Sequence, residues 1–178
     1  MRTLRAILAV LGILLLVAVG LLLAYSLPSH EVVKISGDVN RINGQIINSQ
    51  KMQVNRDVFF IYAENEKTHD MRVFRNEDTH AGFPWYFKYD SFEVQARANN
   101  LANKQAVVTY YGWRVPMFNL FPNAVDVQAW ESPDAPFPLF NTIFFTVLGL
   151  LILVVWWKWW RWRKRRAAAA IAAAPQVE

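Results

Sequence analysis

Two short segments of the chain carry the residue types that could take part in chemistry. Residues 75–79 read Arg-Asn-Glu-Asp-Thr, and residues 110–114 read Tyr-Tyr-Gly-Trp-Arg. Neighbouring carboxylates such as Glu77 and Asp78 could form a general acid/base pair or hold a cation. Adjacent side chains of a strand point to opposite faces, so one site that used both would need a loop. We therefore favour a turn in which Asn76 and Asp78 hydrogen-bond to local backbone.

The two arginines of these segments suit carboxylate partners. The planar guanidinium groups of Arg75 and Arg114 can each donate two parallel hydrogen bonds. An internal ion pair with Glu77, Asp78 or Asp90 is favoured over the capture of an anionic ligand.

An aromatic run lies between these segments. Residues 83–89, Phe-Pro-Trp-Tyr-Phe-Lys-Tyr, hold five rings in seven positions. The rings could form a platform for a ligand, but we favour rings that line the domain core or rest on a membrane surface. Gly112 is expected to permit a bulge or close packing before Trp113. The candidate binding residues are Arg75, Asn76, Glu77, Asp78, Trp85, Tyr86, Trp113 and Arg114.

Several classes of function lack their signatures in this sequence. There is no cysteine, which excludes disulfides, iron–sulfur sites and a cysteine nucleophile. No P-loop, GxSxG, HExxH or glycine-rich dinucleotide motif is present. The three histidines, His30, His69 and His80, have no spacing that supports a metal site. We expect no catalytic residue, no cofactor and no metal, and hence a protein that is not an enzyme.

Two uncharged apolar segments are long enough to cross a membrane. Residues 6–27 and 139–157 contain no charged side chain, and 22 residues of helix reach ~33 Å against a hydrocarbon core of about 30 Å. A cleaved signal peptide is the alternative for the first segment, with Ala24-Tyr25-Ser26 as a cleavage site. The apolar run exceeds the roughly 7–15 residues usual for a signal peptide, which favours a retained anchor.

The positive charge of the chain lies beside these two segments. The net charge is +5, yet eight of the 19 lysines and arginines lie in residues 1–5 and 158–178, so the region between the spans is slightly acidic. This distribution predicts cytoplasmic ends and a periplasmic domain at residues 28–138 in a bacterial inner membrane, rather than nucleic-acid binding. Indole rings mixed with cations anchor the second span at the membrane interface. The anchor residues are Trp156, Trp157, Lys158, Trp159, Trp160 and Arg161.

The central domain reads as mainly β-structure with one helix. Strands are expected at 30–41, 58–62, 71–75, 105–113 and 125–130, with a bulge at Gly37, a turn at Asn43-Gly44 and a further short strand at 45–47. A helix over 91–103 follows the third strand; Ser91 caps it, and Val94, Ala98 and Leu101 recur at helical spacing. This order is that of a small five-stranded barrel of the oligonucleotide/oligosaccharide-binding (OB) type. A β-sandwich, or a sheet with one packed helix, is the alternative.

Several stretches together resemble a bacterial family of small membrane proteins known as domain of unknown function 1523. They are Leu27-Pro28-Ser29-His30 with Val32-Val33, residues 75–79, Phe83-Pro84-x-Tyr86-Phe87-Lys88 with Asp90-Ser91, Tyr111-Gly112-Trp113-Arg114, and Phe121-Pro122-Asn123-Ala124-Val125. The tail after residue 157 lies outside the resemblance. The resemblance implies a bacterial envelope protein and supplies no catalytic residue.

The absence of catalytic motifs and the double anchoring favour a non-enzymatic accessory or scaffold protein. Its partners would be the lipid bilayer and another membrane protein or complex, with a homo-oligomer left open and no nucleic acid expected. The alternative is a periplasmic module that binds a saccharide, lipid or peptide. A hydrolase that uses Glu77 and Asp78 is the third hypothesis.

Overall fold

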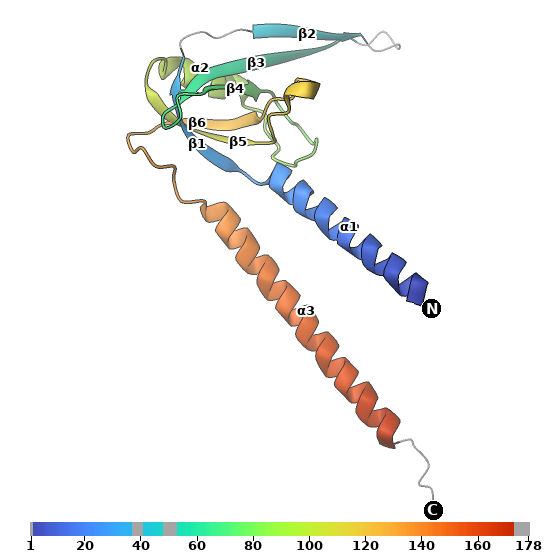
Figure 1. The fold of residues 1–178 in the computed structure, drawn as a ribbon. Coiled ribbons are helices and arrows are strands. Elements are labelled where there is room, and N and C mark those ends of the chain that lie inside the picture. Colours follow the sequence, from blue (N-terminus) through green and yellow to red (C-terminus); the bar gives the residue numbers. More distant parts are fainter. Residues whose placement is uncertain (1, 37–40, 48–52, 173–178) are drawn as a thin grey trace, which may run out of the picture. The chain divides into compact units, whose positions relative to one another are not determined.

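The computed structural model describes residues 2–36, 41–47 and 53–172. The chain forms two compact units, residues 1–137 and 138–178, which are described separately. Figure 1 shows the elements of both units. In chain order they are α1 (Arg2–Ser26), β1 (Ser29–Ile35), β2 (Arg41–Ile47), β3 (Gln53–Asn65), β4 (Met71–Asn76), α2 (Ser91–Asn100), β5 (Gln105–Tyr111), the 3₁₀ turn η1 (Pro116–Phe118), β6 (Asn123–Ala129) and α3 (Leu139–Ala172).

Five of the strands close into a barrel. The order β1-β5-β6-β4-β3 returns to β1 through pairs such as Ile35 with Ala63. All neighbours are antiparallel except β4 and β6, which meet in parallel at Arg75 and Asn123. The single helix α2 follows the third barrel strand, β4, as the sequence predicts. The predicted barrel is confirmed, and the alternatives of a sandwich or a plain sheet are wrong.

The sixth strand, β2, lies outside the closed barrel and pairs with β3. Its seven residues pair with β3, and the pairs include Asn43 with Asp57 and Gly44 with Arg56. The predicted turn at Asn43-Gly44 is therefore wrong, because the ladder with β3 overrides the local turn preference of this dipeptide. The predicted short strand at 45–47 lies within β2, and the predicted bulge at Gly37 lies outside the described residues.

Alternating apolar side chains fill the barrel. β1 points Val33 and Ile35 inward, and every other barrel strand contributes at least one fully buried apolar side chain. One face of α2 packs against the barrel, and Val94 and Ala98 are completely buried, with Leu101 packed beside them. Each large apolar side chain buried in this way stabilises the fold by about 1.5–3 kcal/mol. The predicted helical face of α2 is confirmed.

The limits of α2 differ from the prediction. The N-cap position belongs to Asp90, whose side chain makes no capping hydrogen bond, and Ser91 is the first helical residue. The Ser91 amide donates instead to Oδ1 of Asp78, 2.9 Å away. The cap therefore comes from a residue distant in the sequence, and the prediction that Ser91 caps the helix is wrong. The helix ends at Asn100, three residues before the predicted end.

Both terminal helices are long and apolar enough to cross a membrane by length and composition. Within α1, the stretch that passes this test is Thr3–Ser26, which overlaps the predicted span at 6–27. Within α3, the stretch that passes this test is Leu139–Arg166. Near the end of this stretch, four cations each lie over the ring of the tryptophan four residues earlier. Lys164 Nζ is 3.7 Å from the ring centre of Trp160, for example. Such pairs stabilise the helix beyond the apolar segment by about 0.5–1 kcal/mol each.

Candidate ligand-binding cleft

A cleft of about 280 Å³ opens where β4 ends, beside the β5–β6 loop and the last turn of α1. It brings together four of the eight candidate binding residues, Arg75, Glu77, Asp78 and Trp113. The complete lining is Tyr25, Arg75, Glu77, Asp78, Thr79, Gly82, Phe83, Tyr111, Trp113, Leu120, Phe121 and Asn123. Charged and amide groups therefore line one opening together with aromatic rings, a combination that is common in small-molecule sites.

An ion pair and an amide fix the polar wall of the cleft. The guanidinium of Arg75 is paired with the carboxylate of Glu77, so the ion pair predicted for Arg75 is confirmed. Asn123 holds the Glu77 backbone from both sides: its Oδ1 accepts from the Glu77 amide at 3.0 Å, and its Nδ2 donates to the Glu77 carbonyl at 3.1 Å. The same Nδ2 lies 2.9 Å from the Tyr111 hydroxyl. The sequence did not single out Asn123, although it lies in the Phe-Pro-Asn-Ala stretch of the family resemblance.

The neighbouring carboxylate has a different partner. Asp78 accepts its hydrogen bond from the Ser91 amide at the start of α2, where the partial positive charge of the helix favours an anion. The predicted turn with local backbone bonding is therefore wrong for Asp78, because its partner lies 13 residues away. Glu77 and Asp78 are adjacent, yet one is bound to a guanidinium and the other to a helix end.

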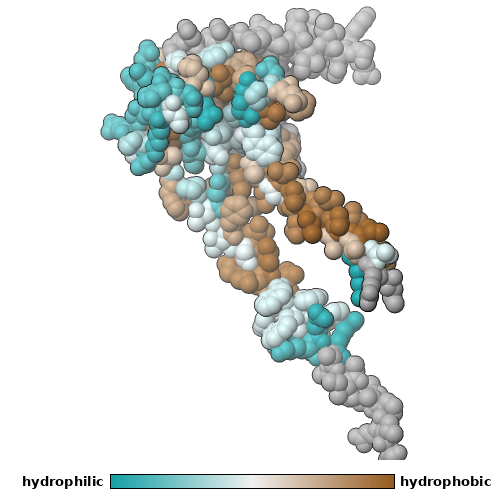
Figure 2. All heavy atoms as spheres, in the orientation of Figure 1, coloured by the Kyte–Doolittle hydropathy of each residue, from teal (hydrophilic) through white to brown (hydrophobic). Residues whose placement is uncertain are grey.

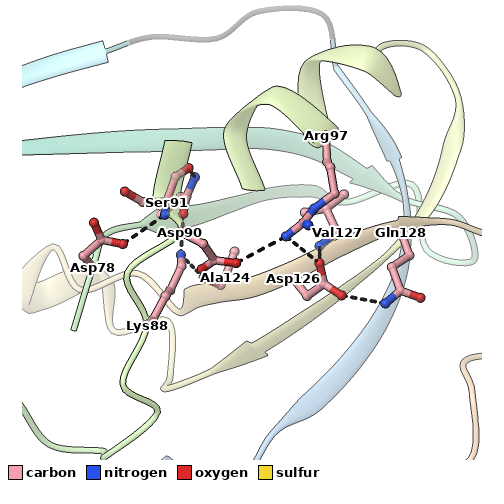
Figure 3. Close-up of polar contacts among 10 residues, drawn as sticks. Asp78, Lys88, Asp90, Ser91, Arg97, Ala124, Asp126, Val127 and Gln128 are labelled. Atoms are coloured by element: carbon pink, nitrogen blue, oxygen red, sulfur yellow. Dashed lines mark hydrogen bonds and ion pairs between the residues drawn. The ribbon is translucent and has the colours of Figure 1, made fainter. Parts of the chain in front are cut away.

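A buried lysine, Lys88, lies near the start of α2, close to Ser91 and Ala124 (Figure 3). Lys88 Nζ donates to the Ala124 carbonyl at 2.6 Å and to the Oδ1 atom of Asn76. Asn76 in turn donates to the Ser91 carbonyl at 2.9 Å and to Gln95 at 3.1 Å. Burial lowers the pKa of Lys88 to about 8, although Asp90 and Asp78 act in the opposite direction. Asn76 is thus a structural residue of the core, not part of the cleft.

Aromatic residues join the end of α1 to the barrel. The Tyr86 ring stacks on Tyr111, with ring centres 4.8 Å apart and planes 9° apart. The Tyr86 hydroxyl donates to the Ser26 carbonyl at 2.6 Å. Tyr25 makes edge contacts with Tyr111 and with Trp113. Burial raises the pKa values of Tyr86 and Tyr111, so both hydroxyls stay protonated at neutral pH.

Gly112 lies against the end of α1 in a backbone conformation that favours glycine. Its amide donates to the Tyr25 carbonyl at 2.9 Å, and its φ of +89° is one that L side chains rarely adopt. A Cβ at this position would lie 3.5 Å from the Tyr25 ring. The predicted close packing at Gly112 is confirmed, whereas the irregularity in the strand pairing lies earlier, between Thr109 and Tyr110.

Trp85 and Arg114 lie outside the cleft as well, as Asn76 and Tyr86 do. Trp85 is exposed and meets only the edge of Phe83 among the ring contacts of the described residues. Phe83, Phe87 and Tyr89 are exposed as well, so the expectation that this run lines the core is wrong for all but Tyr86. Arg114 donates to the Leu120 carbonyl at 2.9 Å and lies over the Phe121 ring. Its predicted ion pair with Glu77, Asp78 or Asp90 does not form, and all three of these residues are described. Arg114 lines a second, adjoining cleft of about 330 Å³.

Within the described part of the chain, no group of three or more histidine or acidic side chains is arranged to hold a metal ion. The lining of the cleft offers hydrogen-bonding groups and aromatic rings as binding elements. A charge-balanced arginine–glutamate pair, one further carboxylate and several rings can bind a polar group that both donates and accepts hydrogen bonds.

The fold and the cleft together define a class of protein: a closed five-stranded barrel with a polar and aromatic cleft beside α1, in a chain that has one long apolar helix before the barrel and one after it. The chain belongs to the family described as Protein of unknown function (DUF1523), whose model matches residues 4–163. The resemblance seen in the sequence is thus confirmed, and the match continues six residues beyond the end expected for it. An uncharacterized protein of Haemophilus influenzae is 37% identical over 118 residues, which cover 63% of this chain and 67% of that protein. No solved structure matches the chain.

Proposed function

We propose that this is a two-pass protein of the bacterial inner membrane, with both ends in the cytoplasm and the barrel in the periplasm. The support is the uncharged length of α1 and of the first part of α3, together with the basic residues that flank them outside the intervening region. Tyr25 lies at the end of the apolar run, so the cleft that it lines would open at the membrane surface.

We further propose that the cleft binds the polar head of an amphipathic ligand, and that a sugar-bearing lipid fits it best. The observation that carries this proposal is the convergence of Arg75, Glu77, Asp78 and Trp113 on one opening beside α1. Because Arg75 and Glu77 neutralise each other, the cleft suits hydroxyl groups better than a free anion. Aromatic rings such as Trp113 can pack against the apolar face of a sugar. The barrel adds support by analogy: in OB-type barrels, ligands bind near the loop that joins the fourth and fifth strands, which is the β5–β6 loop here.

The test is native mass spectrometry of the full chain, released from detergent after purification from bacterial membranes. The wild-type protein should carry a lipid adduct. Trp113→Ala and Glu77→Gln should lose most of it, because the first removes a ring from the cleft and the second breaks the pair with Arg75. Met117→Ala is the matched control, since this side chain is 85% exposed and does not line the cleft. An adduct that survives Trp113→Ala unchanged would contradict the proposal.

The positions of the two carboxylates favour binding over hydrolysis. Glu77 is paired with the Arg75 guanidinium, and Asp78 accepts a hydrogen bond from the Ser91 amide of α2. Both carboxylates therefore already have partners within the protein, which favours a structural role in the wall of the cleft over a role as paired catalytic groups.

An accessory role beside another membrane protein is the second candidate function. It is favoured by Met117 and Phe118, two strongly exposed apolar side chains of η1. A photo-crosslinking residue at Met117 should then form a specific adduct with one protein in intact cells, while one at Asn99, on α2, should not. Equal crosslinking from both positions would contradict this role.

A further inference from the structure

The loop between β4 and α2 is a closed and anchored unit. Lys88 donates its amide to Thr79 Oγ1 at 3.2 Å, and the His80 amide donates to the Lys88 carbonyl at 3.3 Å. The two ends of the loop are thereby tied together, as in a compact surface loop. Near its tip, Tyr86 bonds to the Ser26 carbonyl and so fastens the loop to the last turn of α1. The residues on either side of Tyr86 must therefore lie close to that helix end.

Residues 81–89 of this loop present rings outward and bury their one charge. Phe83, Trp85 and Phe87 are 46%, 68% and 57% exposed. From residue 81 to residue 89, the single charged side chain is Lys88, and it is 4% exposed. A solvated loop normally shows the opposite pattern, with charges outside and rings inside. Trp113, 42% exposed beside Tyr25, extends the same surface. We call Phe83, Trp85, Phe87 and Trp113 the aromatic rim.

The depth of the rim follows from the length of α1. At about 1.5 Å per residue, Ala6 to Tyr25 covers ~30 Å, which is the thickness of the hydrocarbon core. Tyr25 and Ser26 would thus lie at the boundary between the core and the headgroups. Tyr86 and Trp113 contact these two residues directly. Tryptophan and tyrosine are the residues that prefer this layer.

We infer that the aromatic rim is a membrane-docking surface, which inserts into the headgroup layer of the bilayer that α1 spans. Leu21 and Leu22 of α1 are exposed, and one turn further on Tyr25 contacts Trp113 of the rim. Residues 81–89 add no exposed charge to this surface. Figure 2 shows the hydrophobic surface along α1 and hydrophilic surface over much of the barrel. Insertion would hold the barrel against the membrane and keep the cleft beside the lipid surface. The inference rests on the proposed span of α1 and not on the identity of any cleft ligand.

The absence of cysteine from the chain permits a direct test. Single variants Trp85→Cys and Phe87→Cys of the full chain would carry a nitroxide spin label in nanodiscs of phosphatidylethanolamine and phosphatidylglycerol. Collision rates with oxygen and with a water-soluble nickel chelate report on lipid and water exposure. Glu93→Cys, at an exposed position on α2, is the water-exposed control, and Leu15→Cys, within α1, is the lipid-exposed control.

The labels at residues 85 and 87 should show an oxygen-to-nickel collision ratio several-fold above that at residue 93 and approaching that at residue 15. A ratio equal to that at residue 93, with residue 15 clearly in lipid, would overturn docking and leave the span of α1 intact. A water-exposed label at residue 15 would overturn the span and the docking together. Labels at residues 85 and 87 that are shielded from the nickel chelate in native membranes but not in nanodiscs would also overturn docking. A protein partner, and not lipid, would then cover the rim.

Discussion

At the scale of single residues, the cleft depends on a few side chains that each hold two elements together. Tyr86 connects the β4–α2 loop to both α1 and β5, through its hydroxyl and its ring. Asn123 fixes the backbone of Glu77 and contacts Tyr111. Lys88 anchors the same loop to the core. None of these roles depends on a neighbour in the sequence.

Tyr86→Phe separates the two contacts of this side chain. It removes the hydrogen bond to Ser26 and retains the stack on Tyr111, so we expect the free energy of unfolding to fall by about 1 kcal/mol. Tyr86→Ala should lower it by about 3 kcal/mol, since the ring is lost too. Denaturant unfolding of the full chain in detergent, followed by near-UV circular dichroism, measures both values. Tyr89→Phe, at an exposed ring, is the control, and its free energy of unfolding should match that of the wild type. If Tyr89→Phe lowered the free energy of unfolding as much as Tyr86→Phe does, the account would be contradicted.

Lys88 makes the stability of the barrel depend on pH. Its pKa is about 8 in the folded chain and 10.5 in the unfolded chain, so between these values the unfolded state binds more protons. Below about pH 8 the buried Lys88 is charged, and the free energy of unfolding is lowered by the full cost of burying that charge. As the pH rises above 8, Lys88 loses its proton in the folded state and this cost decreases. The free energy of unfolding of the wild type relative to Lys88→Met should therefore rise by about 1 kcal/mol per pH unit between about pH 8 and 10. A constant difference over this range would show that Lys88 is not buried in its charged form.

The sequence predicted part of this chemistry and missed the rest for physical reasons. The Arg75–Glu77 pair is local, and the residue types alone suggested it. Lys88 and Asn123 were missed because their partners lie 12 to 46 residues away, across contacts that only the closed barrel creates. The ring content of residues 83–89 was visible, but which rings face outward depends on the tie between Tyr86 and Ser26.

At the scale of elements, the start of α2 is linked to the cleft through Asp78. Periodicity identified the helix and its buried face, because Val94, Ala98 and Leu101 lie on one side. It could not identify the cap, since the residue in the capping role comes from the other end of the β4–α2 loop. The Asn43-Gly44 dipeptide also shows that local sequence is not sufficient. Its preference for a turn is outweighed by the hydrogen-bonded pairing of β2 with β3.

Removal of the Asp78 carboxylate should loosen the first turn of α2. We expect Asp78→Ala to lower the free energy of unfolding by about 1 kcal/mol, with a smaller loss for Asp78→Asn, which can still accept the Ser91 hydrogen bond. Amide hydrogen exchange over residues 91–95 should become faster in the alanine variant. Asp90→Asn is the matched control, because its contact with Arg97 is exposed and long, at 3.5 Å. An unchanged exchange rate in Asp78→Ala would contradict a capping role.

At the scale of the whole molecule, the order of strands around one helix favoured a small barrel and left a β-sandwich or a sheet with one packed helix as alternatives. Alternation along each strand determines which side chains fill the core, and the position of α2 after the third barrel strand follows from the order of the elements. The place where the cleft would open could not be predicted in the same way, because it depends on the contacts of α1 with Gly112, just after β5, and with Tyr86 in the β4–α2 loop.

The central claim, that the barrel and the two chain ends lie on opposite sides of a membrane, is tested most directly by thiol labelling of single-cysteine variants. The two variants are Asn99→Cys, on the exposed side of α2, and Arg163→Cys, beyond the apolar part of α3. Cells that produce each variant, with a permeabilised outer membrane, would be treated with a membrane-impermeant maleimide. We predict that residue 99 is labelled in these cells and that residue 163 is labelled only after lysis. Labelling of residue 163 in unlysed cells, with residue 99 protected, would contradict the account.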